Sequence, residues 1–122
     1  MNTRKLFHGA NGDKILHILK IGKITPDSQN EIYFDESNYA NCFVHGADSK
    51  RKSSFVLAVE VELDNIHYYR ASKPGNPTTL VVNTPMPFPV KVLGMYIRSG
   101  SRDDGFDIEY VAGEETAKLR LQ

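Results

Sequence analysis

The chain has 122 residues, of which 40% are hydrophobic and 25% charged, and its 15 basic side chains are balanced by 15 acidic ones. This composition predicts one ordinary globular domain over residues 1–122 and excludes a disordered tail, and the zero net charge excludes a general attraction to nucleic acid or anionic lipid. No apolar run reaches the length of a membrane span, and the single Cys42 excludes an internal disulfide. We therefore expect a cytoplasmic protein, made in that cytoplasm or delivered into it, with no membrane partner.

The first expected element is a short strand over residues 4–10, which ends in a histidine and a glycine. Adjacent Leu6 and Phe7 predict that this strand is buried on both faces. Asn11 then offers a helix N-cap, apolar residues follow with helical spacing, and Gly22 supplies a left-handed stop. The pattern predicts a short helix between these two caps.

A second short strand is expected over residues 31–34, and the Asp35 that follows it is a good cap for a helix over residues 36–45. Tyr39 and Phe43, with the residue after each, recur at the spacing of one helix face, and a glycine follows as a stop. The pattern therefore predicts an amphipathic helix whose aromatic side chains face the core.

The middle of the chain is expected to be rich in strands. The basic, serine-bearing segment 47–54 is predicted to be an exposed loop, and residues 55–63 form the strongest strand pattern, apolar at first and then alternating. Residues 64–77 contain two prolines and a glycine near their end and are expected to be irregular, whereas the β-branched run 79–83 predicts a strand.

The C-terminal third continues with strand patterns. Three prolines over residues 85–89 are expected to prevent regular pairing, and a strand is expected over residues 90–98. Alternating apolar residues over 106–110 and 117–121 predict a hairpin across Gly113. This order of elements predicts an α+β fold with two helices and about six or seven strands.

Two side chains at strand ends are candidates for a binding site. His8 shares a face with Leu6 and stands beside Gly9, where the missing side chain would let a ligand approach the backbone. The hydroxyl of Tyr33 needs a hydrogen-bond partner, which an open strand edge provides. The structural alternatives are a histidine tied to a carbonyl group and a tyrosine packed in the core. The four histidines occur at unrelated spacings, so no metal site is expected.

Together these stretches resemble the NAD-binding half of the ADP-ribosyltransferase superfamily, and most closely the branch with a His-Tyr-Glu signature that includes the poly-ADP-ribose polymerases. Residues 6–10, Leu-Phe-His-Gly-Ala, are similar to the Leu-Tyr-His-Gly-Thr strand of that group, and residues 31–34, Glu-Ile-Tyr-Phe, to its Gly-Ile-Tyr-Phe strand. The helix start at residues 37–40 and the strand over 55–63 also match in kind, so that the likeness covers residues 4–63.

The resemblance implies the fold of that family, an α+β split antiparallel β-sandwich with two short helices around a cleft for NAD. It implies that His8 hydrogen-bonds the adenosine-side ribose, that Gly9 clamps the nicotinamide amide through its backbone, and that Tyr33 stacks under the nicotinamide ring. Tyr39 and Phe43 are expected to be core or cleft-wall residues, one of which would stack on a flat ring of the ligand.

The glutamate of the signature, which bonds the nicotinamide-side ribose and supports the oxocarbenium-like state, has two candidate positions here. If the strand over residues 79–83 is the glutamate strand, Thr79 holds the position, which implies transfer of single ADP-ribose units rather than polymer formation. Glu109 is the other candidate, because it follows a polar loop as the family's glutamate follows its acceptor-recognition loop. Its structural alternative is an outward-facing carboxylate on a strand.

The resulting expectation is an NAD-dependent mono-ADP-ribosyltransferase that modifies a protein or RNA acceptor, with NAD as substrate and no metal. The size of a bare catalytic domain is typical of a toxin or effector, whose partners would include a cognate immunity or antitoxin protein. Two alternatives stay open. One is an inactive module of the same fold that binds NAD, ADP-ribose or a partner protein, and the other is the related RNA 2′-phosphotransferase, which also consumes NAD and relies on arginines around its cleft.

Overall fold

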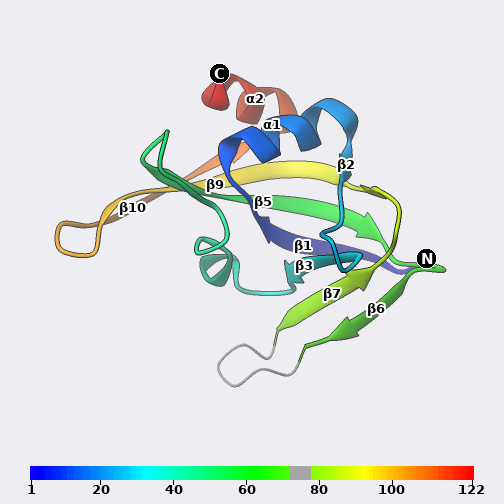
Figure 1. Cartoon of the computed structure of the whole chain (residues 1–122). Helices are drawn as coiled ribbons and strands as arrows, with labels where there is room; N and C mark the ends of the chain where they lie inside the picture. The colour runs from blue at the N-terminus through cyan, green and yellow to red at the C-terminus, as the bar shows by residue number, and fades with distance from the viewer. Residues whose placement is uncertain (72–77) are drawn as a thin grey trace.

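The structure, a computed structural model, describes residues 1–71 and 78–122. In this part of the chain it has an α+β fold with two α-helices, one 3-10 helix and ten strands (Figure 1). In chain order they are β1 (Thr3–Gly9), α1 (Gly12–Ile21), β2 (Lys23–Ile24), β3 (Glu31–Asp35), η1 (Tyr39–Cys42), β4 (Ala47–Asp48), β5 (Ser53–Glu62), β6 (His67–Arg70), β7 (Thr79–Asn83), β8 (Phe88–Pro89), β9 (Lys91–Ser101), β10 (Gly105–Ala112) and α2 (Glu114–Leu121).

The main sheet is antiparallel, and its two halves meet at one residue pair. The strand order is β10-β9-β5-β1-β3-β7-β6, with β4 paired to the start of β5. β1 pairs with β5 over its whole length, from Thr3 to Gly9, whereas β1 and β3 share only the pair of Phe7 with Asp35. Beyond this pair β1 and β3 separate. The expected antiparallel α+β fold is confirmed, and the separation creates space between the two halves.

Helices pack on both faces of the sheet. α1 and α2 lie side by side on one face (Figure 1), where they help to enclose the larger core. Leu6 and Phe7, adjacent in β1, enter different clusters, as the alternation of side chains predicts. Complete burial of each such side chain contributes about 1.5–3 kcal/mol to stability. η1 packs against the other face, where the second cluster contains Phe7, Cys42, Phe43, Val56 and Ala58.

The capping residues of α1 act as predicted. The side chain of Asn11 accepts a hydrogen bond from the backbone N–H of Lys14 at 2.9 Å. At the other end Gly22 has a φ of 70° and donates its N–H to the carbonyl of Ile18 at 2.7 Å. Because this left-handed conformation favours glycine, Gly22 ends the helix and turns the chain toward β2.

Residues 36–45 do not form the expected α-helix. Only Tyr39–Cys42 is helical, as a 3-10 helix, and the backbone hydrogen bonds around it join residues three positions apart. The cause is local competition: Asp35 Oδ1 accepts hydrogen bonds from the backbone N–H groups of Ser37 at 3.0 Å and Asn38 at 2.7 Å. Such side-chain bonds give the backbone an alternative to the α-helical pattern, which the apolar spacing did not reveal.

Residues 117–121 form part of a helix, α2, rather than the predicted strand. Ala117 and Leu121, one helical turn apart, are buried, while Leu119 between them is 70% exposed. Apolar residues at every second position also satisfy the spacing of one helical turn, and the alternation was read with the wrong period. The hairpin is made instead by β9 and β10, so the prediction of a hairpin across Gly113 is wrong.

Pairing also occurs where irregular chain was expected. β6, His67–Arg70, lies within the segment 64–77 and pairs with β7 as an edge strand. β8, Phe88–Pro89, pairs with β2 in a separate two-stranded ladder, where a proline is tolerated because no further strand needs its N–H. The prolines therefore shorten this pairing rather than prevent it. Residues 73–77 lie outside the described part of the chain.

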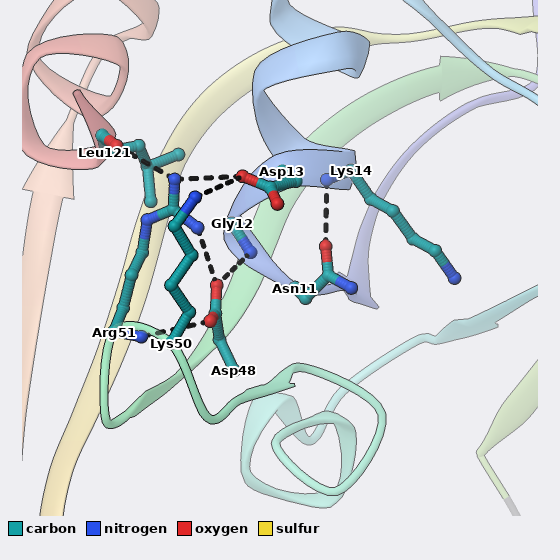
Figure 2. Close-up of polar contacts among 8 residues, drawn as sticks. All are labelled: Asn11, Gly12, Asp13, Lys14, Asp48, Lys50, Arg51 and Leu121. Atoms are coloured by element: carbon teal, nitrogen blue, oxygen red, sulfur yellow. Dashed lines mark hydrogen bonds and ion pairs between the residues drawn. The ribbon is translucent and has the colours of Figure 1, made fainter.

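The basic loop before β5 is not simply solvent-exposed, because Arg51 ties it to both helices (Figure 2). Its guanidinium group donates to Asp48 Oδ2 at 2.9 Å, to Asp13 Oδ1 at 3.0 Å and to the carbonyl oxygen of Leu121 at 3.1 Å. Asp48 Oδ2 also accepts the backbone N–H of Gly12 at 2.8 Å. Burial acts to raise the pKa of Asp48, but the hydrogen bonds from Gly12 and Arg51 hold it below its ordinary value.

Replacing Arg51 by alanine is expected to lower the free energy of unfolding by about 3 kcal/mol, because Asp48 would keep a buried charge without its cation. Lys50→Ala is the matched control: its ammonium lies 3.9 Å from Asp13, its side chain is 75% exposed, and exposed pairs contribute less than about 1 kcal/mol. Urea denaturation at pH 7 measures the free energy of unfolding of both variants.

The effect of Arg51→Ala should also depend on pH. Because the pKa of Asp48 is lowered in the folded state, the ion pair with Arg51 stabilises the fold above the ordinary pKa of an aspartate, and its contribution is lost on acidification. The difference between parent and Arg51→Ala should therefore shrink below about pH 4. Equal losses in Arg51→Ala and Lys50→Ala would contradict the network.

Candidate functional site

A cleft of about 860 Å³ lies where β1 and β3 separate. α1 contributes Asp13, Lys14 and His17 to its lining, and the chain at the end of η1 contributes Asn41 and Cys42. The remaining residues come mainly from the end of β1, the segment after β2, and the whole of β3. Ligand pockets commonly have volumes of about 300–1,000 Å³, so this cleft has room for a ligand larger than a single nucleoside.

His8 spans the gap between the two halves of the sheet. Its Nδ1 lies 2.8 Å from the backbone oxygen of Tyr33, and its ring packs on Phe34 with 5.5 Å between centroids. Because a carbonyl oxygen only accepts, Nδ1 carries the proton and Nε2 keeps a lone pair. Burial lowers the pKa of His8 below its ordinary value, and the charges of His45 and Lys14 act in the same direction. The imidazole is therefore neutral at pH 7 and presents a hydrogen-bond acceptor.

Tyr33 reaches the cleft from the other face of β3, because side chains alternate and Phe34 points into the larger core. Its side chain is 41% exposed, and its hydroxyl donates to Glu31 Oε1 at 3.1 Å. Tyr69 of β6 donates to the second oxygen of the same carboxylate. Burial and the bond to Glu31 raise the pKa of Tyr33, and the bond to Glu31 raises the pKa of Tyr69 to about 12. Glu31 thus fixes the orientation of two neutral phenol rings.

Gly9 lines the cleft, but the space beside its Cα is occupied by the chain itself. A Cβ at this position would lie 2.0 Å from the carbonyl oxygen of Cys42 and 3.2 Å from the backbone nitrogen of Gly46. The sequence-based interpretation was that the missing side chain admits a ligand. The packing of η1 against the end of β1 requires the glycine in any case.

Thr79 also lines the cleft, beside a buried carboxylate. It is buried and faces Asp35 in the pairing of β7 with β3. Asp35 is only 2% exposed; its Oδ1 accepts hydrogen bonds from the turn that follows and from Thr78, while Oδ2 is buried and has no hydrogen-bond partner among the described residues. The position expected for the family's glutamate thus holds a hydroxyl next to a negative charge.

Three of the predicted site residues lie outside the cleft. Tyr39 and Phe43 belong to the second core cluster, where Tyr39 stacks on Tyr96 with 4.0 Å between centroids and Phe43 is 1% exposed. Glu109 lies on β10, the edge strand at the opposite end of the sheet from β6, and forms an ion pair with Arg120. Tyr39 and Phe43 are therefore core residues, the first of the two roles expected for them, and Glu109 is an outward-facing carboxylate; the expectation that any of the three contacts a ligand in this cleft is corrected.

Sequence reasoning did not single out several polar residues of the cleft. Lys14 and His17, three positions apart on α1, line the cleft, and so does His45, which follows η1. Glu31 was treated only as the start of a strand. The sequence could have indicated Lys14 and His17, because both lie in the helix that directly follows the strand end at His8 and Gly9. No such feature of the sequence indicated His45.

Comparisons of the chain with protein-family models, curated proteins and solved structures give no match. Within residues 1–71 and 78–122, no group of three or more His, Cys, Asp or Glu side chains is placed to hold a metal ion. Neither α-helix of the described chain has the length and hydropathy needed to cross a bilayer.

Proposed function

We propose that the chain is an NAD-dependent mono-ADP-ribosyltransferase of the His-Tyr type, with NAD as its substrate. One observation carries the proposal: a single cleft of about 860 Å³ gathers His8, Gly9, Tyr33 and Thr79 from three strands at the point where the sheet divides. The resemblance to the ADP-ribosyltransferase superfamily assigns His8, Gly9 and Tyr33 to NAD binding and gives Thr79 as one of two candidates for the glutamate position.

The chemistry of the cleft suits each part of NAD. The neutral His8 offers Nε2 to a hydroxyl of the adenosine-side ribose, and Tyr33 offers an exposed ring to the nicotinamide. Lys14 adds positive charge on the α1 side of the cleft, where the pyrophosphate would lie, and His17 adds an imidazole that can hydrogen-bond it. In the reaction the bond from the ribose carbon to nicotinamide breaks, its electron pair leaves with nicotinamide, and a nucleophile of the acceptor attacks the electron-poor carbon. Holding NAD in this orientation lowers the barrier by about 7–11 kcal/mol at most.

Thr79 limits the reaction to single ADP-ribose units. A threonine hydroxyl carries no charge and cannot balance the positive charge that develops on the ribose as a glutamate would. Asp35, buried opposite Thr79 with one oxygen unpartnered in the described chain, supplies a fixed negative charge at this end of the cleft. The acceptor is a protein or RNA encountered in a cytoplasm, where the protein is made or delivered.

The proposal is tested by incubating the purified protein with NAD and measuring free nicotinamide. His8→Ala and Tyr33→Ala are each expected to lower the rate about 100-fold, as removal of one preorganised contact does. Thr79→Ala should lower it severalfold if the hydroxyl contacts the ribose. Glu109→Ala is the matched control, because Glu109 lies outside the cleft, and it should release nicotinamide at the parent rate.

The second candidate function, an NAD- or ADP-ribose-binding module without catalysis, is favoured by the hydroxyl at Thr79 in place of a carboxylate. Isothermal titration with NAD separates the two functions. Saturable binding without nicotinamide release, weakened by His8→Ala, would establish the module. A parent protein that neither binds NAD nor releases nicotinamide would refute both.

A further inference from the structure

A second, shallower hollow lies on the face of the sheet that η1 covers, next to the β9–β10 ribbon. It has a volume of about 310 Å³ and is bordered by Lys52, Arg98 and Phe106. Three serines, Ser49, Ser53 and Ser54, also line it. Two cations and three hydroxyl groups around one hollow are the groups that bind a phosphate.

Arg98 is held in place by aromatic rings. Its guanidinium carbon lies 4.9 Å from the ring centroid of Phe43 and 4.3 Å from that of Phe106. Among the described residues it has no carboxylate within ion-pair distance, and neither has Lys52. A planar guanidinium in contact with two rings loses less side-chain freedom when it binds the oxygens of a phosphate.

The other groups of the hollow support the same ligand chemistry. Ser54 is opposite Arg98 in the pairing of β5 with β9, so both side chains leave the same face of the sheet and line the hollow. Asp48 also borders the hollow, but its carboxylate is neutralised by Arg51 and by the N–H of Gly12. The charge available to a ligand in the hollow is therefore positive.

An exposed aromatic strip continues from the hollow along β10. We define it as Phe106, Ile108 and Tyr110 of β10 with Tyr96 of β9; the three β10 side chains are 46–49% exposed. Tyr110 lies opposite Tyr96, with 4.7 Å between ring centroids. Side chains two positions apart on one face of a strand are about 6.8 Å apart, so the strip offers evenly spaced apolar surfaces. The β9–β10 ribbon extends away from the rest of the fold (Figure 1).

The acidic residues of β10 do not face this strip. Asp107 and Glu109 alternate with the aromatic positions and point to the opposite face, where Glu109 pairs with Arg120 of α2. The zero net charge of the chain therefore hides a local separation of charge at the ribbon, with the cations Arg98 and Lys52 on the aromatic side.

We propose that the hollow and the aromatic strip together bind single-stranded nucleic acid, with a backbone phosphate between Arg98 and Lys52 and successive bases against Phe106, Ile108 and Tyr110. Stacking surfaces beside a cationic groove are how proteins bind single strands without reading their sequence. This binding needs no NAD and goes beyond the transfer reaction; where both hold, it makes RNA the acceptor class.

The test measures fluorescence anisotropy of a labelled ten-nucleotide uridine RNA with the full chain, in the absence of NAD. The parent should bind, and Phe106→Ala and Arg98→Ala should each weaken binding about 10-fold. Lys52→Ala, an exposed loop substitution that leaves the core intact, should weaken binding about 3-fold and reduce the salt dependence by about one ion. Lys20→Ala on α1 removes an equal charge far from the strip and should bind as the parent does.

Two results would overturn the proposal. The first is a parent that does not bind the RNA, or variants Lys52→Ala and Phe106→Ala that bind as tightly as the parent. The second is a phosphoserine peptide that competes for the hollow while Phe106→Ala has no effect, which would make the hollow a phosphoprotein site. Nicotinamide release does not enter either measurement, so the two proposals fail separately.

Discussion

Gly9→Ala is expected to destabilise the protein by about 3 kcal/mol, at the upper end of the usual cost of overfilling a packed site. The new Cβ would lie 2.0 Å from the carbonyl oxygen of Cys42 and 3.0 Å from its carbonyl carbon, and these are backbone atoms that no side-chain rotation can remove. Either β1 or η1 must shift, so the cleft that both elements line would change shape as well. Guanidinium denaturation followed by circular dichroism measures the loss.

Gly22→Ala is the matched control for this substitution. Gly22 has a φ of 70° and nothing within 4 Å of its would-be Cβ, so alanine there meets conformational strain alone, of about 1 kcal/mol. Gly9→Ala should therefore cost clearly more than Gly22→Ala although Gly9 needs no left-handed backbone. A smaller loss in Gly9→Ala would mean that η1 does not pack on the end of β1 as described.

The parts of the fold that the sequence predicts are those whose local signals and tertiary roles agree. α1 has a capping asparagine, an apolar face and a glycine stop, and each operates as expected. The β5 pattern, apolar and then alternating, matches its central position between β1 and β9. In both elements the local preference of the residues and their burial favour the same structure, so the element can be predicted from the sequence alone.

The predictions of secondary structure are wrong where local polar side chains or an ambiguous apolar period determine the conformation. The side chains of Asp35 and Asn38 divert the chain into η1, and the alternation over residues 117–121 fits a strand and a helix equally. β6 was missed because only its pairing with β7 gives the residues 67–70 a structure. Residues of β7, with which β6 pairs, are distant in sequence, and no pattern within residues 67–70 indicates this pairing.

The same difference separates the site residues that were predicted correctly from those that were not. His8, Gly9, Tyr33 and Thr79 lie in one cleft because β1, β3 and β7 are neighbours in the sheet. The resemblance could identify these strands but not which face η1 would cover. Tyr39 and Phe43 point from η1 into the second core cluster rather than into the cleft, and the pairing of β10 with β9 separates Glu109 from the cleft.

Cys42 should react with a thiol reagent about 1,000-fold more slowly in the folded protein than in guanidinium. Cys42 is the last residue of η1 and is buried, and burial, with the charge of Asp35, raises the pKa of its thiol to about 12 from an ordinary 9.0. Three pH units lower the reactive thiolate about 1,000-fold at pH 8, because only the thiolate attacks. The matched control is Val44→Cys in a Cys42→Ser background, since Val44 is 75% exposed and only two residues away. The thiol of this introduced cysteine should react at the rate of an unfolded chain.

A native Cys42 that reacts as fast as this control would show that η1 opens readily. Slow labelling that Gly9→Ala accelerates would confirm that the same contact closes the thiol and shapes the cleft.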